Sequence, residues 1–287
     1  MELKVKGHSG CQIDIVNDGS NLFINKSTYD KKYIDRLRLQ GRKQIEASKN
    51  KYQHIRIPQI YEVEESQDHL ILKMEYVYSQ NFIDYFEDAG FEQINYFIKA
   101  IEIFIDSEIE KSPLSEISVD VVLNKFNDVY DKVQHNNYVD SSDFNEIMQR
   151  AKSMFESMPD KICIPVGVCH GDLTYSNILF NGNNYYLIDF LDSFVESPLL
   201  DLVKIRQDSC FGWSQLMFTK DYDAIRLKMI NAKIDSSIDK YYREKFQWYS
   251  DYYNPFQVMN FLRVLQYAKD EKVISYLKNV LNRLLCC

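Results

Sequence analysis

The sequence has no excess of positive charge. Its 34 Lys and Arg residues are outnumbered by 42 Asp and Glu residues, which gives a formal net charge of −8 at pH 7. Non-specific binding to nucleic acid draws its affinity from basic side chains that neutralise phosphates. We therefore expect no nucleic-acid partner.

Long apolar runs are missing as well. No segment reaches the roughly 18 uncharged apolar residues that a membrane-spanning helix needs. Residues 1–6 contain no apolar core of signal-peptide length. We expect a cytoplasmic protein without a membrane partner.

The six cysteines lack paired Cys-x-x-Cys spacing, so the sequence indicates neither a zinc site nor a disulfide framework. Apolar residues, in contrast, are plentiful: 45% of the chain is hydrophobic and 14% is aromatic. This composition is sufficient for a substantial core and argues against disorder. With 287 residues the chain can form one large domain or two lobes.

The most informative stretch runs from Val168 to Phe190. An apolar segment leads into a polar loop, a second apolar segment ends at Phe180, and a third follows an Asn-Gly turn and ends in Asp189. Short apolar runs bounded by turn residues are typical of buried strands, and Asn-Gly between two of them predicts a β-hairpin. The polar side chains at the strand ends are therefore expected on a rigid frame.

Three of these polar side chains predict a metal-phosphate site. Asp172 lies at the tip of the loop, Asn177 where the next strand begins, and Asp189 at the far end of the hairpin. Folding of the hairpin can bring one amide and two carboxylates to one edge. Oxygen ligands of this kind suit Mg²⁺, which takes the rest of its shell from water and nucleotide phosphates. A polar turn that matches by chance is the alternative.

The spacing resembles the catalytic loop and the metal-binding aspartate of the protein-kinase-like superfamily. His170-x-Asp172-x-x-x-x-Asn177 is followed by Ile188-Asp189-Phe190. The form His-Gly-Asp-Leu-x-x-x-Asn, with Ile-Asp-Phe in place of Asp-Phe-Gly, is more similar to the aminoglycoside phosphotransferase and choline kinase family than to protein kinases. The resemblance is specific over residues 168–202 and only topological elsewhere.

The resemblance implies an α+β, bilobal protein-kinase-like fold. Residues 1–78 would form a nucleotide-binding lobe with a small antiparallel sheet and one helix. Residues 79–287 would form a larger, mostly helical lobe with the catalytic loop, the metal site and the acceptor pocket.

The resemblance also implies roles for the motif residues. Asp172, beside His170, would orient the acceptor hydroxyl and accept its proton, although a lone histidine is more often a satisfied buried side chain. Asn177 and Asp189 would hold Mg²⁺ against the phosphates of ATP or another nucleoside triphosphate. Asp201 resembles the acid that braces this loop in the family; a carboxylate at a helix N-terminus is an equal alternative.

Alternating apolar and polar residues, followed by an Asp-Gly turn, predict three short antiparallel strands over residues 3–24. Gly7 and Gly10 lie between the first two strands. A kinase-like lobe covers the nucleotide phosphates there with backbone N–H groups, and small residues let the chain come close. The segment departs from Gly-x-Gly-x-x-Gly, and an ordinary hairpin loop explains it equally well.

Lys26 ends the third strand. A kinase-like fold needs a cation there for the α- and β-phosphates and a carboxylate on the next helix to fix that cation. The pattern over residues 30–49 predicts this helix, and Glu46 is its only glutamate. We expect Lys26 to pair with Glu46; a solvated lysine is the alternative.

Two further strands are predicted at residues 55–61 and 69–77, around an acidic turn at 62–65. The second strand runs into polar residues before helical sequence begins, which is where a bilobal kinase has its hinge. On the resemblance alone, the adenine edge would bond to the backbone from Glu75 to Val77.

Helical periodicity dominates the rest of the chain. A long core helix is predicted after Gly90, and further helices around residues 121–129, 144–155, 256–269 and 272–285. In the aromatic stretch 246–253, Trp248 and Asp251 could hold a cationic amine by cation–π contact, as choline-kinase-like proteins do. Aromatic core packing is the alternative. Asp192 is expected to face the acceptor.

Together these expectations describe an ATP- and Mg²⁺-dependent phosphotransferase that acts on a hydroxyl of a small molecule such as a sugar, an aminoglycoside or an amino alcohol. A protein kinase would need a longer segment after Asp189. A noncatalytic nucleotide-binding pseudokinase would lack one of the groups that are present here. A two-metal phosphoesterase calls for more ligands than His170 and Asp172 supply.

Overall fold

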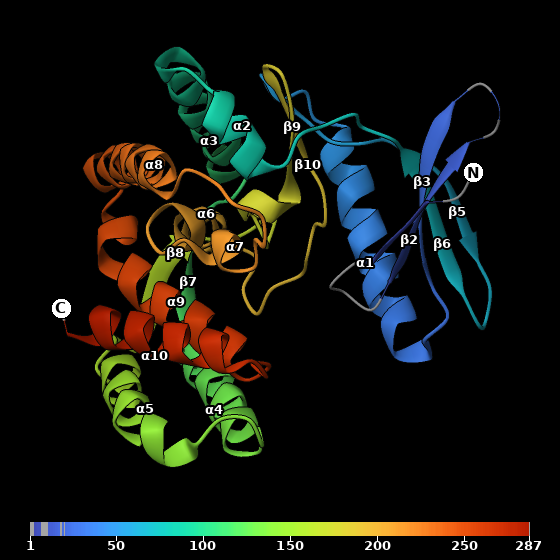
Figure 1. Cartoon of the computed structure of the whole chain (residues 1–287). Helices are drawn as coiled ribbons and strands as arrows, with labels where there is room; N and C mark the ends of the chain where they lie inside the picture. Colours follow the sequence, from blue (N-terminus) through green and yellow to red (C-terminus); the bar gives the residue numbers. More distant parts are fainter. Residues whose placement is uncertain (1–2, 7–10, 18, 20, 287) are drawn as a thin grey trace. The chain divides into compact units, whose positions relative to one another are not determined.

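The computed structural model describes residues 3–6, 11–17, 19 and 21–286 (Figure 1). They pack as two compact units, Met1–Phe104 with Tyr175–Asp192 and Ile105–Thr174 with Ser193–Cys287. Among the described residues, no helix has the length and apolar character needed to cross a membrane. The lobe boundary expected at residue 78 stays a prediction.

The first unit is built on a five-stranded antiparallel sheet with the order β1-β2-β3-β6-β5. Its strands are β1 (Leu3–Lys6), β2 (Gln12–Asn17), β3 (Leu22–Thr28), β5 (Ile60–Glu65) and β6 (Leu70–Glu75). The three strands predicted near the N-terminus are confirmed.

Helix α1 (Lys31–Ser48) packs on this sheet, as Figure 1 shows. It begins where the side chain of Asp30 accepts a hydrogen bond from the backbone N–H of Lys32, which satisfies an otherwise unpaired donor. Leu37 is fully buried against apolar side chains of β6. Gly41 permits a close approach, because a Cβ there would meet Leu72 at 3.1 Å. The helix predicted over residues 30–49 is confirmed.

The strand predicted at residues 55–61 is misplaced. Ile55–Arg56 form β4, which pairs in parallel with β10 outside the five-stranded sheet. The acidic residues 62–65, expected in a turn, lie in β5. Pro58 explains the break, because it has no N–H to donate to a ladder. Its carbonyl accepts instead from Gln44 Nε2 at 2.9 Å.

A second, three-stranded sheet of the first unit contains the hairpin predicted around the Asn-Gly turn. Strands β9 (Ile178–Asn181) and β10 (Asn184–Leu187) are antiparallel, and Gly182 adopts φ +55° in the turn. Phe180 and Tyr185 pack on aromatic rings of α2 (Phe82–Asp88) and α3 (Phe91–Glu110). The long core helix expected after Gly90 is therefore confirmed as α3.

The second unit is mostly helical. It holds the two-stranded sheet of β7 (Leu114–Ser118) and β8 (Lys161–Pro165), with α4 (Asp120–Gln134), α5 (Ser141–Glu156), α6 (Pro198–Ser209), α7 (Trp213–Leu216), α8 (Ala224–Lys245), α9 (Gln247–Leu265) and α10 (Glu271–Leu285). Helix α9 lies against α4, α6, α8 and α10 (Figure 1). Helices α4, α5, α9 and α10 were predicted, although α9 begins at Gln247 and not at residue 256, whereas α7 and α8 were missed.

The apolar segment before the polar loop is not a strand. Strand β8 ends at Pro165, and the next backbone N–H groups bond outside any ladder. Gly167 donates to the Glu196 carbonyl at 2.8 Å, and Val168 donates to Ser112 Oγ at 2.8 Å. The backbone N–H groups of this irregular segment are paired with a side chain and a loop carbonyl, and an apolar pattern in the sequence does not reveal such partners.

Candidate active site

The polar loop is held by a carboxylate from α6. Asp201, fully buried in the first turn of that helix, accepts from the backbone N–H of His170 at 2.5 Å and of Gly171 at 2.8 Å. Gly171 adopts φ +85°, a conformation that costs glycine little. The bracing role expected for Asp201 is confirmed by these two hydrogen bonds.

Burial raises the pKa of Asp201, and the nearby His170 and a hydrogen bond with Glu108 act in the opposite direction. Glu108 is itself buried, so two carboxyl groups share this interior. Burying such groups is costly unless they are hydrogen-bonded. Two backbone N–H donors to one carboxylate are a compensation of this kind, and they fix the start of the loop.

His170 holds the loop that carries Asp172. Its ring is fully buried, and Nδ1 accepts the backbone N–H of Asp172 at 3.2 Å. The carbonyl of Asp172 then accepts from Thr174 at 2.8 Å. The Asp172 side chain remains about a quarter exposed, at 24%. The geometry fits a positioning role for His170.

Lys204 was not singled out from the sequence. Its Nζ lies 3.0 Å from Asp172 Oδ1, and it belongs to the same helix as Asp201. The spacing of three residues on a helix, which places two side chains on one face, is the signal that could have found it.

Asn177 and Asp189 lie at the same end of the β9–β10 hairpin. The ladder continues past the strands, because Ile188 donates its N–H to the Asn177 carbonyl at 3.1 Å. Asp189 adopts φ +62°, which is unfavourable for a residue with a Cβ. Among the described residues no group of three or more His, Cys, Asp or Glu is placed to hold a metal. An amide and one carboxylate are the oxygen donors here.

Lys26 is a buried cation with two polar partners. Its Nζ lies 2.7 Å from Asp189 Oδ1 and 3.1 Å from Gln40 Oε1. The Lys26 side chain is 6% exposed and that of Asp189 is 34% exposed. A buried ammonium needs such partners, and the solvated lysine considered from the sequence is excluded.

The expected pair of Lys26 with Glu46 is not formed. Glu46 points to solvent on α1 and accepts from Lys49, with 74% of its side chain exposed. Gln40 faces Lys26 instead. Six residues separate the two positions, which places them on different faces of a helix with 3.6 residues per turn.

The structure describes only some of the other residues predicted to bind the nucleotide. Gly7 and Gly10 lie outside the described residues. The backbone N–H of Glu75 donates to the Gln59 carbonyl at 2.8 Å and is therefore already used. In the described part of the chain, no hydrogen bond involves the backbone N–H of Val77, so this donor remains available to a base.

The residues suggested for acceptor binding differ in their exposure to solvent. Trp248 is buried at 7% exposure and stacks on Phe246, with ring centroids 5.2 Å apart. Asp251 is exposed and accepts from Gln247 Nε2 at 2.8 Å. Asp192 is exposed. Their substrate roles stay predictions.

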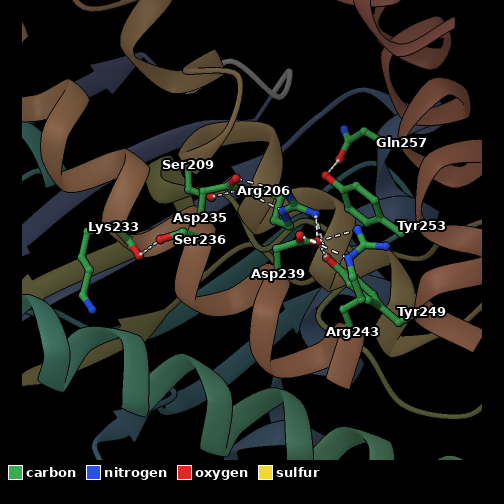
Figure 2. A network of polar contacts seen from close by, with 10 residues as sticks. All are labelled: Arg206, Ser209, Lys233, Asp235, Ser236, Asp239, Arg243, Tyr249, Tyr253 and Gln257. Carbon is green, nitrogen blue, oxygen red and sulfur yellow. Dashed lines mark hydrogen bonds and ion pairs between the residues drawn. The ribbon is translucent and has the colours of Figure 1, made fainter. Parts of the chain in front are cut away.

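Other rings of the aromatic stretch surround a buried arginine (Figure 2). Arg206 Nε and Nη1 lie 2.7 and 2.6 Å from Asp235 Oδ1 and Asp239 Oδ1. Nη1 also donates to Tyr249 Oη at 2.7 Å, and the guanidinium lies 4.3 Å from the centre of the Tyr253 ring. The aromatic core expected as the alternative is what the structure shows for these two tyrosines.

Part of the chain matches a known protein family. Residues 125–228, less than half of the chain, match the phosphotransferase enzyme family. No curated protein sequence matches.

Solved structures match over the whole chain. The GDP and kanamycin complex of APH(2")-IIia has a TM-score of 0.63 at 15% identity, covering 99% of this chain and 92% of that one. Amicoumacin kinase with AMP-PNP and Ca²⁺ gives 0.61 at 11% identity, covering 99% and 88%. Glucosamine kinase with glucosamine, ADP and inorganic phosphate gives 0.60 at 12% identity, covering 99% and 76%.

The chain shares its fold with the solved structure of APH(2")-IIia. The predicted α+β class, with an antiparallel N-terminal sheet and a mostly helical remainder, is therefore confirmed. Identities of 11–15% establish the fold alone, and fold does not determine chemistry. The chemistry has to be argued from the site.

Proposed function

We propose that the chain is a small-molecule kinase that transfers the γ-phosphoryl group of ATP, with Mg²⁺, to a hydroxyl group of an amino sugar or aminoglycoside. The family match over residues 125–228 supports phosphoryl transfer. The observation that carries the proposal is the 2.7 Å contact between Lys26, a buried cation, and the carboxylate of Asp189, a residue whose backbone has a positive φ.

The first unit supplies the groups for nucleotide and metal. Lys26 would bind the α- and β-phosphates, and Gln40 keeps its ammonium in place at 3.1 Å. Asn177 and Asp189 would hold the metal, because hard oxygen donors of this kind suit Mg²⁺. When bound, the ion neutralises charge on the transferred phosphate. The left-handed backbone at Asp189 supports this role, since strain of this kind gathers at ligand sites.

The second unit supplies the group for the acceptor. Asp172 would accept a hydrogen bond from the acceptor hydroxyl and take its proton as the oxygen bonds to phosphorus and the bond to the nucleotide's bridging oxygen breaks. Because the transition state is loose, alignment matters more than base strength. The loop that carries Asp172 is fixed at its start by Asp201 and His170, which suits alignment.

The acceptor class follows from charge and from the relatives. Kanamycin and glucosamine, the ligands of two structural relatives, both carry amines beside hydroxyl groups. A chain with a net charge of −8 attracts such cations. Because ATP is the proposed donor, we place this activity in the cytoplasm.

An acceptor screen tests the proposal. The purified chain, with ATP or GTP and Mg²⁺, is offered kanamycin, glucosamine, choline, ethanolamine and dephosphorylated casein. We expect nucleoside diphosphate release that depends on an amino-sugar acceptor, and a phosphorylated acceptor in the mass spectrum. Phosphorylation of casein alone would support the protein-kinase alternative, and no transfer to any acceptor would contradict the proposal.

Two variants tie the activity to the site. Asp172→Asn and Asp189→Asn should each lower turnover by about 10²- to 10⁴-fold, because the first removes the group that would accept the proton of the acceptor hydroxyl and the second removes a carboxylate that would hold the metal. The thermal unfolding midpoint of each variant serves as the folding control. A folded variant with near-normal turnover would show that the assigned residue does not take part.

A further inference from the structure

Lys204 and Asp201 make one face of α6 the support of the Asp172 loop. The two residues lie three positions apart on the helix, so their side chains leave it on the same side. Asp201 binds the backbone N–H groups of His170 and Gly171, and Lys204 reaches the carboxylate of Asp172 at 3.0 Å. One helix thus fixes both the backbone and the side chain of the loop.

This ion pair differs from the solvated pairs on the surface. The side chains of Lys204 and Asp172 are 16% and 24% exposed, whereas those of Lys161 and Glu116 in the same unit are 71% and 64% exposed. Solvated pairs of the second kind contribute little to stability. Within the described residues Lys204 makes no other ion pair, so its ammonium is directed at Asp172 alone.

The position also matters for the reaction. A carboxylate that takes the proton of the acceptor hydroxyl must lie about 3 Å from it, and the attacking oxygen lies a similar distance from phosphorus. An ammonium 3.0 Å from that carboxylate is therefore close to the attacking oxygen. An ion pair at this distance restricts the rotamers that the Asp172 side chain can adopt.

We propose that Lys204 is a positioning residue that holds the carboxylate of Asp172 in line with the acceptor hydroxyl. This inference rests on the proposed kinase activity. It goes beyond that activity because it assigns the alignment of Asp172 to a side chain outside the loop motif. Lys204 acts through Asp172, so its contribution should disappear when Asp172 can no longer accept the proton.

The test combines two substitutions in the full chain. Transfer from ATP is measured with the acceptor that responds in the screen. Lys204→Met should lower kcat about 10- to 100-fold with the KM for ATP changed less than about twofold, since a misaligned group loses rate more than binding. Lys204→Arg keeps a cation and should retain a larger part of kcat than Lys204→Met.

Lys204→Met added to Asp172→Asn should cause less than about a twofold further loss, because residues that act as a unit are non-additive. Lys161→Met is the matched control and should leave kcat unchanged. The inference is overturned if Lys204→Met keeps kcat within twofold of the parent, or loses the same factor in the Asp172→Asn background. Absence of transfer from ATP to any acceptor by the parent chain overturns the proposed function, and this inference with it.

Discussion

Lys26 Nζ lies 2.7 Å from Asp189 Oδ1, although 163 positions separate the two residues in the sequence. The pair joins β3 to the end of the β9–β10 hairpin within the first unit. A nucleotide with its metal would compete for both partners, because phosphates attract the ammonium and Mg²⁺ attracts the carboxylate. If Asp189 binds the metal as proposed, Gln40 would be the contact that keeps Lys26 oriented.

A first prediction concerns the helix partner of Lys26. Gln40→Ala should raise the KM for ATP severalfold, because the ammonium loses the acceptor at 3.1 Å that orients it. Glu46→Ala, six residues later on the same helix, is the matched control. It should leave the KM within about twofold, since Glu46 contacts only the exposed Lys49 in the described part of the chain. Steady-state kinetics give the KM for ATP of both variants. A larger increase in Glu46→Ala than in Gln40→Ala would restore Glu46 as the partner of Lys26.

A second prediction separates catalysis from stability on α6. Asp201 and Asp208 are both buried acids that accept from backbone N–H groups. Replacing either with Asn leaves at least one donor without a charged acceptor, at a cost of about 1–3 kcal/mol in unfolding free energy. Asp201→Asn should also lower kcat, because Asp201 holds the loop of Asp172. Asp208→Asn should lower kcat less, because Asp208 accepts from Ser214 at 2.6 Å, and Ser214 lies outside that loop. Equal effects of the two variants on kcat would contradict the bracing role.

A third prediction concerns the Arg206 network of Figure 2. Burial alone would lower the pKa of Arg206, but Tyr253 and Asp235 outweigh it, so the pKa lies above its ordinary value and the side chain stays charged. Arg206→Met leaves the partly buried Asp235 without its cation and leaves Asp239 with Arg243 alone, and it should cost about 3–5 kcal/mol in urea unfolding. The triple variant with Asp235→Asn and Asp239→Asn should recover part of that loss. If the triple variant is as unstable as the sum of the single variants, the ion pairs are not what stabilises this region.

A fourth prediction gives a pH dependence. Burial raises the pKa of the Cys210 thiol from 9.0 to about 11. Only the thiolate is nucleophilic, so at pH 8 the alkylation of Cys210 should be about 100-fold slower than for an ordinary thiol. Its rate should rise about tenfold per pH unit until the pH approaches 11, as deprotonation proceeds. Mass spectrometry after iodoacetamide treatment can follow it against the exposed Cys163, and equal rates for the two at pH 8 would refute the shift.

The fold could be predicted where neighbours in sequence are neighbours in space. The β9–β10 hairpin follows from an Asn-Gly turn between two apolar runs, and α1 and α3 follow from their helical periodicity. The strand predicted before the polar loop does not form, because the backbone N–H groups of this segment bond to Ser112 and Glu196 and not to a neighbouring strand. Those partners lie far away along the chain, and the local pattern holds no trace of them.

The candidate site also has features that the sequence predicted and features that only the structure revealed. The sequence by itself predicted which residues carry the proposed chemistry, because the order of His170, Asp172, Asn177 and Asp189 is a local pattern of residue types. Only the tertiary structure decided that Lys26 meets Asp189 and Gln40 rather than Glu46, and that Lys204 reaches Asp172. The physical reason is that these side chains meet through the packing of separate elements. Which face of a helix is buried depends on the whole core and not on any one segment.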